Sequence, residues 1–456
     1  MNMPSLASGP EGPGALRPLL GTVLDALEAG GRTRGGPLPG GGPAAVAARM
    51  RTAVGDVLPE EGDPDALRRL VQALAEGAAD PADPLCAAHL HCPPLAVATA
   101  ADLAASALNP SLDSWDQAPS ASELEALVTG ALATEVYPRQ PAPDCLVTTG
   151  GTESNQLALL LAREARGGRV RLVAGAHAHH SLGRAAWLLG LPGPVVVPTP
   201  AGVLDPAALD AALSGLSGPL LVAATAGTTD TGRIDPLPEI AARCRAHGAR
   251  LHIDAAYGGG LLFSDRHRTR LAGLDAADTV TLDLHKLGWQ PVAAGLLAVR
   301  DARDVTALHQ RADYLNADDD TEAGLPDLLG RSPRTTRRPD VLKIAVTLKT
   351  LGRTGLGTLV DQVCDHAREF AGLIAAHPGF ELYDRPAIST VLFRPAGAPD
   401  DAVAAVRRTL LADGRAVLGR ARPDGRLWLK ATLLNPHARP ADLAALLELV
   451  EGHTPR

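Results

Sequence analysis

The feature that most constrains the fold is an alternation of short apolar runs with amphipathic segments between about residues 122 and 300. Strand-like runs there read VRLVAG, PVVVP, PLLVAATAG, ARLHIDAAY, TVTLDL and GLLAVR. Helix-like segments such as SLGRAAWLLG, PAALDAALSG and LPEIAARCRAHG lie between several of them. Strands alternating with helices are typical of an α/β domain with a mostly parallel sheet. We therefore expect ligands to bind where these strands end, at their carboxyl ends.

The regions on either side predict different structure. Residues 17–30 have the apolar spacing of an amphipathic helix, and a second helix is expected at about residues 65–75. Between these helices, the Gly/Pro-rich stretch ending at Pro43 predicts a flexible loop. After about residue 340, long helix-like segments precede the strand-like runs STVLFR and RLWLKATLLN. We predict a helical N-terminal segment (1–120, with 1–60 partly flexible), a large α/β domain (121–340) and a small α+β domain (341–456).

Composition excludes several classes of protein. The net charge is −8, and a nucleic-acid-binding protein needs a basic face to neutralise phosphates. No apolar run approaches the roughly 18 residues that a membrane-spanning helix needs, and the N-terminus does not resemble a signal peptide. The five cysteines are an odd number and contain no CxxC pair. We therefore expect no disulfide framework, no membrane or nucleic-acid partner, and a reducing, cytoplasmic location.

A glycine-rich turn begins the candidate site. The stretch TTGGTESNQLALLLAR reads as the end of a strand, a turn and a helix. Backbone N–H groups at a helix start bind anions, Gly151 permits close approach of a ligand, and the Thr152 hydroxyl can donate a hydrogen bond. The pattern is neither GxGxxG nor a Walker motif, so it does not indicate a dinucleotide or ATP. An ordinary capped helix remains an alternative.

Three further motifs carry residues that could take part in catalysis or bind a cofactor. In ARLHIDAAY, Asp254 ends the strand-like part and is followed by small residues, which suits a flat ligand close to the backbone. Lys286 follows the run TVTLDL and can serve as the amine nucleophile for a Schiff base. In AGAHAHHSLGRAA, His179 can stack on a planar cofactor. The alternatives are a capping aspartate, a solvated lysine and, for the clustered histidines, a zinc site.

Together and in this order, the motifs resemble one family. GGTES, HHSLGRAA, ATAGTTDTGRIDP, HIDAAYGG and DLHK are similar to motifs of the fold-type I pyridoxal-phosphate enzymes, specifically the group II amino-acid decarboxylases. The resemblance runs from about residue 89 to about residue 449. It implies a transferase-like α/β large domain, pyridoxal 5'-phosphate as cofactor, an amino-acid substrate and a homodimer.

The resemblance also implies roles for individual residues. Lys286 would bind the cofactor covalently, Asp254 would pair with the pyridine nitrogen, and His179 would stack on the ring. Ala256 would pack near the opposite face of the ring. The phosphate would be held by Gly151, Thr152 and His285. Thr225 and Asp283 would complete the pocket, although the aromatic-type enzymes carry asparagine at the position of Asp283.

Two stretches resemble one branch of the family. Residues 89–127 and 312–343 are similar to the corresponding parts of bacterial diaminobutyrate decarboxylases and siderophore-pathway lysine decarboxylases. The resemblance therefore implies a basic diamino-acid substrate. Within the second stretch, an acidic group could attract the distal ammonium of a substrate and an arginine could bind its carboxylate, but solvated loop residues are the alternative. The acidic residues are Asp318, Asp319, Asp320 and Glu322, and the arginines are Arg331, Arg334, Arg337 and Arg338.

The second stretch also departs from relatives. Aromatic-type enzymes carry a catalytic tyrosine where PDLLGRSP stands here. Tyr314 lies upstream and cannot simply take that role, so the proton donor to Cα stays unassigned. Other readings also stay open: a decarboxylase or decarboxylation-coupled amine oxidase acting on an aromatic or acidic amino acid, and a cofactor-free interaction protein. A zinc-dependent hydrolase would use His177, His179, His180, His252 and Asp254.

Overall fold

The computed structural model describes residues 4–454, which divide into two compact units. Unit 2 comprises residues 94–364 and 386–388. Unit 1 comprises the N-terminal residues up to 93, together with residues 365–385 and 389–456. The three-part domain division expected from the sequence stays a prediction.

Unit 2 is built on a seven-stranded sheet with strand order β1-β7-β6-β5-β4-β2-β3. Strands β2, β3, β4, β5 and β6 are parallel, and β7 is antiparallel to both of its neighbours. Every residue of β4, β6 and β7 is buried, as expected for strands covered on both faces. The strands are β1 (Asp144–Thr148), β2 (Arg171–Gly175), β3 (Val195–Val197), β4 (Leu220–Thr225), β5 (Arg250–Ala255), β6 (Thr279–Asp283) and β7 (Gly295–Val299).

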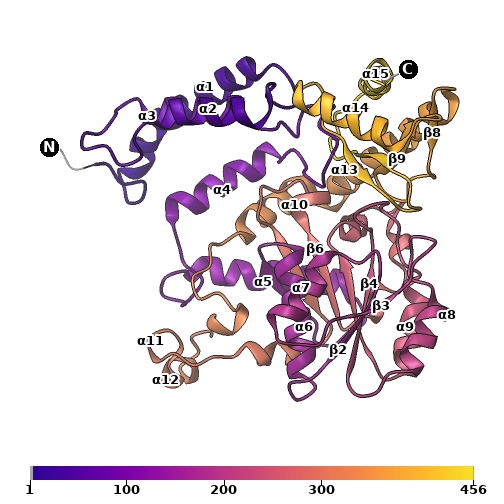
Figure 1. Cartoon of the computed structure of the whole chain (residues 1–456). Coiled ribbons are helices and arrows are strands. Elements are labelled where there is room, and N and C mark those ends of the chain that lie inside the picture. The colour runs from indigo at the N-terminus through magenta and orange to yellow at the C-terminus, as the bar shows by residue number, and fades with distance from the viewer. Residues whose placement is uncertain (1–3, 455–456) are drawn as a thin grey trace. The chain divides into compact units, whose positions relative to one another are not determined.

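Helices connect and cover these strands. Helix α6 packs with α7 and contacts β5, β6 and β7, whereas α8 packs with α9 (Figure 1). The α-helices are α4 (Ala96–Leu108), α5 (Pro119–Val136), α6 (Gly151–Glu164), α7 (His180–Leu188), α8 (Pro206–Ser214), α9 (Leu237–Ala246), α10 (Leu284–Leu287), α11 (Asp313–Asn316) and α12 (Asp318–Glu322). Short 3-10 helices are η1 (Gly258–Phe263), η2 (Arg268–Leu271), η3 (Leu274–Ala276), η4 (Ala302–Leu308) and η5 (Leu329–Arg331).

Unit 1 joins segments that lie far apart in the sequence. Its four-stranded antiparallel sheet has the order β10-β11-β9-β8. Residues 85–87 of the N-terminal segment hydrogen-bond to Val417 and Thr432, and Ala87 belongs to the apolar core of the unit. The elements are β8 (Phe380–Leu382), β9 (Thr390–Pro395), β10 (Gly419–Ala421), β11 (Trp428–Thr432), α14 (Asp400–Ala412) and α15 (Pro440–Gly452).

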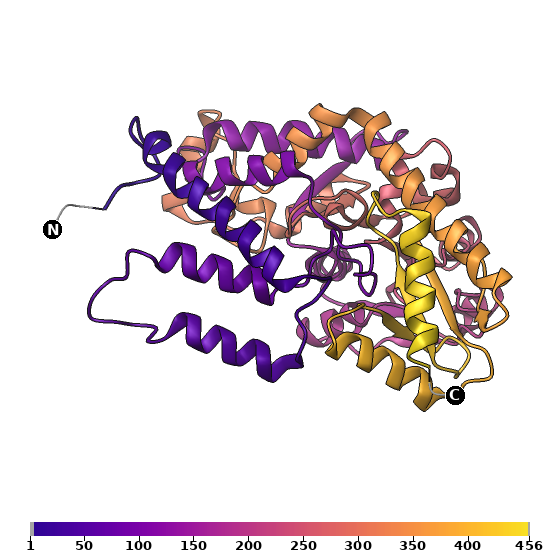
Figure 2. The same ribbon diagram turned by 90° about the horizontal axis from the view of Figure 1, so that it is seen from above.

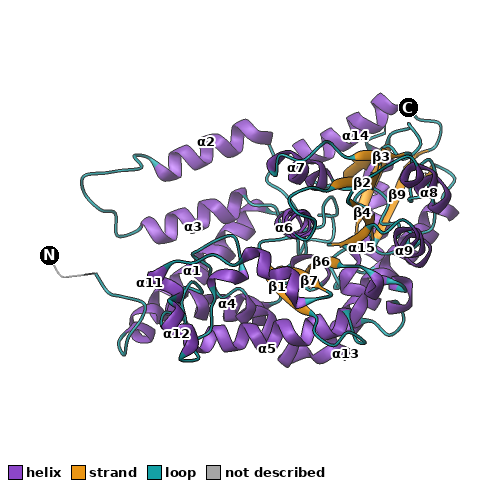
Figure 3. Ribbon diagram, turned by 90° about the horizontal axis from the view of Figure 1, so that it is seen from below, coloured by secondary structure: helices purple, strands orange, loops and turns teal. Residues whose placement is uncertain are grey.

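The N-terminal part of unit 1 is helical. Helices α1 (Gly12–Arg34) and α2 (Gly42–Val54) both contact α3 (Ala66–Gly77), and Figure 2 shows the three in indigo. A long loop joins α2 to α3 (Figure 3). The sequence predicted α1 and α3 but missed α2, whose alanine-rich stretch begins next to the Gly/Pro-rich loop. Within residues 4–454, no helix is long and apolar enough to cross a membrane.

The structure confirms the predicted fold class, with a large α/β part, helical N-terminal segments and a small α+β part near the C-terminus. The long helices expected after residue 340 form α13 (Val341–Ala376). Gly352 interrupts this helix with a φ of 62°, a left-handed conformation that glycine adopts without steric cost. The two helices predicted for this region are therefore present, and they meet at the kink at Gly352.

Candidate active site

Lys286 lies just after β6 and faces a buried carboxylate. The chain leaves the strand at Asp283 and turns at once into α10, which carries His285 and Lys286. The Lys286 Nζ is 2.9 Å from the Asp283 Oδ2, and the His285 Nε2 is 3.5 Å from the same oxygen. The Ala294 N–H donates to the His285 Nδ1, so a neutral His285 carries its proton on Nε2. Burial lowers the pKa of His285, which favours this neutral form.

The glycine-rich turn lies against these residues. A Cβ on Gly150 would stand 3.0 Å from the His285 Cε1, and the φ of Gly150 is 147°. A Cβ on Gly151 would stand 3.1 Å from the Ala256 Cβ and 3.2 Å from the Asp283 Oδ2. Gly151 is the first residue of α6, where backbone N–H groups lack partners within the helix. The turn therefore brings the anion-binding end of a helix next to Asp283, His285 and Ala256.

Strand register places further polar side chains in one row. Thr225 of β4 pairs with Asp254 of β5, and Asp254 pairs with Thr281 of β6. Because paired residues on neighbouring strands point to the same face, their side chains lie together. The Ala256 N–H donates to one oxygen of Asp254 at 3.1 Å. The Thr225 hydroxyl is buried and has no hydrogen-bond partner among the described residues.

Asn155, which sequence reasoning missed, lies at the centre of this row. It is fully buried on the first turns of α6, and its Nδ2 donates to Asp254 Oδ2 at 2.8 Å and to Ser181 Oγ at 2.9 Å. Its Oδ1 lies 2.9 Å from His252 Nε2 and 3.0 Å from Thr281 Oγ1. The available signal was the run of polar residues at the start of α6, in which Asn155 lies four positions after Gly151 and so on the same side of the helix.

His179 joins this network through Ser181. Its Nδ1 is 2.8 Å from the Ser181 hydroxyl and accepts the Ser181 N–H at 3.4 Å. Burial lowers the pKa of His179, and the nearby charge of Asp254 opposes this only in part. The histidine is therefore neutral at neutral pH, with its proton on Nε2.

The clustered histidines do not converge on a common point as zinc ligands do. His177 Nε2 pairs with Asp235 at 3.1 Å, and His252 is bonded between Asn155 and Thr279. Burial lowers the pKa of His252 to about 4. Across residues 4–454, no group of three or more histidine, cysteine or acidic side chains has the arrangement of a metal site.

The arginines of residues 312–338 pair with acidic residues of the body of unit 2. The hydrogen-bonded pairs are Arg331 with Asp144, Arg334 with Glu153 and Arg337 with Glu125, and Arg338 forms an ion pair with Asp102. Arg334 thereby attaches this segment to the first turn of α6. These arginines are engaged as anchors of the segment rather than held free for a substrate carboxylate.

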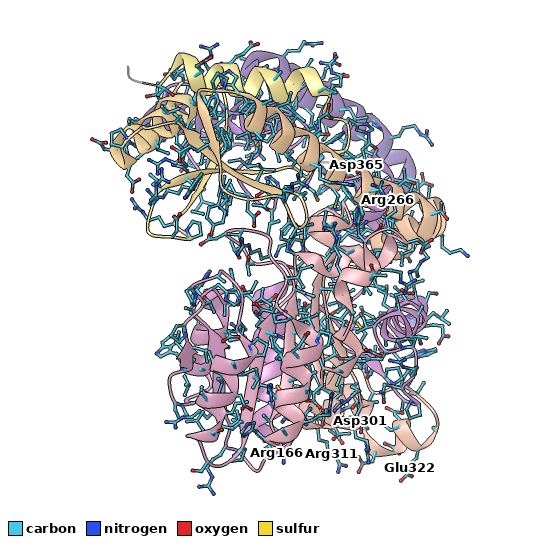
Figure 4. The ribbon with its side chains drawn as sticks, turned by 90° about the vertical axis from the view of Figure 1, so that its right-hand side faces the viewer. Arg166, Arg266, Asp301, Arg311, Glu322 and Asp365 are labelled. Carbon is cyan, nitrogen blue, oxygen red and sulfur yellow. The ribbon has the colours of Figure 1, made fainter. Side chains whose placement is uncertain are left out.

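The acidic residues of the same segment face solvent. Asp318, Asp319, Asp320 and Glu322 are all exposed, and Arg311 pairs with Asp318 at 2.6 Å. Figure 4 shows Arg311 and Glu322 at the outer edge of this segment. Tyr314 on α11 is 82% exposed. This geometry favours the interpretation of a solvated acidic loop.

Comparison with known proteins identifies the family. The pyridoxal-dependent decarboxylase conserved domain matches residues 50–396. The chain belongs to the pyridoxal-dependent decarboxylase family. This confirms the resemblance inferred from the motifs, and it makes the protein a lyase that uses pyridoxal phosphate.

Relatives with named activities span most of the chain. The L-2,4-diaminobutyrate decarboxylase of Rhizobium meliloti (strain 1021) is 41% identical over 419 residues, covering 88% of this chain and 84% of the relative. The enzyme of the same name from Acinetobacter baumannii is 32% identical over 433 residues, covering 87% of this chain and 84% of the relative.

Solved structures share the fold. The glutamate decarboxylase domain of diaminobutyrate-pyruvate transaminase and L-2,4-diaminobutyrate decarboxylase from Vibrio parahaemolyticus superposes with a TM-score of 0.86 at 30% identity. The alignment covers 98% of this chain and 97% of that one. Oryza sativa TDC with PLP and tryptamine gives a TM-score of 0.88 at 24% identity, covering 98% and 99% of the two chains, which is a likeness of fold.

The residues of the candidate site fit pyridoxal phosphate. The Thr225 hydroxyl and the Asp283 Oδ1 are buried polar atoms without partners in the described part of the chain, as expected where a polar ligand binds. The helix start at Gly151 suits a phosphate. An amine, a carboxylate and an imidazole, supplied by Lys286, Asp254 and His179, are the groups that an aldehyde and a pyridine ring require.

Proposed function

We propose that this enzyme decarboxylates a basic L-diamino acid, of the 2,4-diaminobutyrate, lysine or ornithine type, to the corresponding diamine. The observation that carries the proposal is the 41% identity to an L-2,4-diaminobutyrate decarboxylase over 88% of the chain. A relative of the same name at 32% identity supports the same substrate class.

The geometry supports a division of roles among the residues of the site. Lys286 would supply the amine that binds the cofactor aldehyde, and Asp254 would hold a proton on the pyridine nitrogen. His179 would stack on one face of the ring, with Ala256 near the other. Gly151, Thr152 and His285 would hold the phosphate. Thr225 and Asp283 would complete the pocket with their buried, unpartnered oxygens.

These positions account for the chemistry. When bound, pyridoxal phosphate supplies a ring that accepts the electron pair left when carbon dioxide departs. Asp254 is suited to keep the ring nitrogen charged because its carboxylate is buried and is oriented by Asn155 and Ala256. His179, neutral and protonated on Nε2, can donate one hydrogen bond without adding a charge beside the substrate. The strands and α6 exclude water from the Asp254 side of the site.

The deciding experiment is a product assay. Purified enzyme loaded with pyridoxal phosphate is incubated separately with 2,4-diaminobutyrate, ornithine, lysine, aspartate, glutamate and the aromatic amino acids. Amines and aldehydes are identified by mass spectrometry, and heat-inactivated enzyme is the control. A diamine formed from one diamino acid is expected. Turnover of only an acidic or aromatic substrate, or aldehyde as the main product, would contradict the proposed substrate or outcome.

We also propose that the enzyme is a homodimer. Helices α1 and α3 present leucines that are unusually exposed for their type, and Leu24 and Leu74 are 65% and 64% exposed. Contiguous exposed apolar surface marks interaction sites. Light scattering coupled to size exclusion should give twice the chain mass of 46.9 kDa, and a monomer at micromolar concentration would contradict the proposal. None of the five cysteines forms a disulfide within the described residues, which supports a cytoplasmic location.

A further inference from the structure

The buried polar network contains one residue whose four hydrogen-bonding positions are all used. The Asn155 amide donates to Asp254 and Ser181, and its carbonyl oxygen faces the donors of His252 and Thr281. An asparagine side chain offers two donor hydrogens and two acceptor lone pairs, so this set is complete. Reversing the amide would direct its oxygen at the Asp254 carboxylate, which cannot donate when ionised. Only the observed orientation gives the Asp254 Oδ2 a donor from Asn155.

This orientation fixes the direction of every hydrogen bond around it. Because Asn155 Oδ1 only accepts, His252 must carry its proton on Nε2, and its Nδ1 then accepts from the Thr279 hydroxyl at 2.9 Å. Because Ser181 accepts from Asn155, its hydroxyl hydrogen is free to point at the His179 Nδ1. His179 is thereby held with its proton on Nε2. One amide determines the environment of both Asp254 and His179.

We propose that Asn155 is a positioning residue that holds the Asp254 carboxylate and, through Ser181, selects the tautomer of His179. The proposal rests on the proposed function, because it assigns Asp254 and His179 to the cofactor ring. Removal of the Asp254 bond would leave a buried carboxylate with the Ala256 N–H as its remaining hydrogen bond from the protein. Removal of the Ser181 hydroxyl would leave the His179 Nδ1 with a long contact to the Ser181 backbone N–H.

The sharpest variant is Asn155→Asp, which changes one NH2 group to oxygen at nearly constant volume. Two carboxylates would then lie at hydrogen-bond distance and would share a proton. The charged and titratable groups around this point are Asp254, His252, His179, Lys286 and Asp283. Of these, Asp254 is the one in hydrogen-bond contact with the Asn155 Nδ2. The variant therefore acts on the carboxylate assigned to the ring nitrogen.

The first measurement is the dissociation constant of pyridoxal phosphate from the apoprotein, obtained by equilibrium dialysis. A hydrogen bond to a charged group is worth roughly ten- to a hundredfold in an equilibrium constant, and we expect Asn155→Asp to weaken cofactor binding by about that factor. The second measurement is the absorbance of the reconstituted enzyme between about pH 5.5 and 9. We expect a pH-dependent change that the wild type lacks. With a diamino acid as substrate, kcat should fall more than KM rises.

Two companion variants complete the test. Ser181→Ala removes the hydroxyl that joins Asn155 to His179 but leaves the bond from Asn155 to Asp254 in place, and we expect cofactor affinity and kcat to fall by about three- to tenfold. Ser154→Ala is the matched control, because this fully buried hydroxyl on the same helix bonds Thr148 and the Leu296 carbonyl instead. Ser154→Ala should change thermal stability but leave cofactor affinity and absorbance unchanged.

The outcomes separate the two proposals. A folded Asn155→Asp variant with wild-type cofactor affinity and absorbance would overturn the role of Asn155. If that variant does not fold, wild-type behaviour of Ser181→Ala would overturn it instead. A wild type that binds the cofactor but decarboxylates no diamino acid would overturn only the proposed substrate, since both cofactor measurements need no substrate. A wild type that binds no cofactor would overturn both.

Discussion

The polar network beside β5 and the segment of residues 312–338 use charged and polar groups in opposite ways. In the network, Asn155 of α6 bonds to His252 and Asp254 of β5 and to Thr281 of β6, and all four side chains are buried. In the segment, the arginines pair with acidic residues of the body of unit 2, and the acidic side chains face solvent. The comparison shows that a charged residue in the sequence marks a functional site only where the fold buries its side chain and directs it at the same point as other polar groups.

Lys286 lies beside the buried Asp283 in the candidate site. Lys286→Ala removes the amine assigned to covalent cofactor binding, so decarboxylation should fall by about 10⁴-fold or more. Cofactor should no longer survive borohydride reduction as a covalent adduct on the tryptic peptide. Lys349→Ala, an exposed lysine on α13, is the control and should match wild type. Normal turnover by Lys286→Ala would end the assignment.

Asp254→Asn tests whether catalysis needs the negative charge of this buried side chain. The change keeps the shape of the side chain and removes its negative charge, so kcat should fall by roughly 10²- to 10³-fold. Steady-state kinetics with cofactor at saturation gives the measurement. The exposed Asp401→Asn is the control. A kcat within threefold of wild type would count against the role of Asp254.

The buried His252 should make the free energy of unfolding depend on pH. Its pKa falls from 6.5 to about 4 on burial, so the unfolded chain binds a proton in this pH range that the folded chain does not. Stability should therefore decrease as the pH falls from about 6.5 toward 4, by up to about 1.4 kcal/mol per pH unit from this group. Urea unfolding at several pH values measures the slope. His252→Gln, which can still donate to Asn155, should flatten it, and an unchanged slope would contradict the prediction.

Arg334→Gln tests the attachment of residues 312–338. The Arg334–Glu153 pair is partly exposed, and such pairs contribute up to about 1 kcal/mol. Limited proteolysis between residues 318 and 324 should therefore accelerate by up to about fivefold. Arg303→Gln is the control, because that side chain is 89% exposed and pairs only two residues away. Equal cleavage rates for the two variants would show that the pair does not hold the segment.

The smallest effect on activity is expected for the acidic residues between positions 318 and 322. Replacing Asp318, Asp319 and Asp320 by asparagine and Glu322 by glutamine should leave KM for a diamino acid within about twofold of wild type, because all four side chains are exposed. The measurement is steady-state kinetics at low and physiological salt. A KM raised tenfold would mean that this loop binds the substrate ammonium after all, and would reverse the contrast between the two regions.

Much of the fold was predictable because it follows from local pattern. Apolar runs such as those of β4 and β6 are long enough, and bounded clearly enough, to be recognised as strands. The motifs around Gly151, Asp254 and Lys286 lie where those strands end, and the structure brings them together. Their roles stay predictions.

Other features could not be predicted, mostly because they depend on contacts between segments that lie far apart in the sequence. Asn155 looked like one of several polar residues in the first turns of α6, and its role depends on the strand register that places His252 and Thr281 opposite it. The pairing of Arg334 with Glu153 joins residues 181 positions apart, which no spacing rule reaches. Helix α2 was missed because its glycine and proline neighbours predicted a loop.

The discontinuity of unit 1 has a consequence for synthesis on the ribosome. Its N-terminal segment ends at residue 93, and the strands with which that segment pairs are not made until after residue 365. At about 5–20 residues per second, the intervening chain takes roughly 15–55 seconds to emerge. During that time residues 85–87 lack their partners Val417 and Thr432, while unit 2 can already begin to fold. The core of unit 1, to which Ala87 belongs, can therefore be completed only after the C-terminal strands have been made.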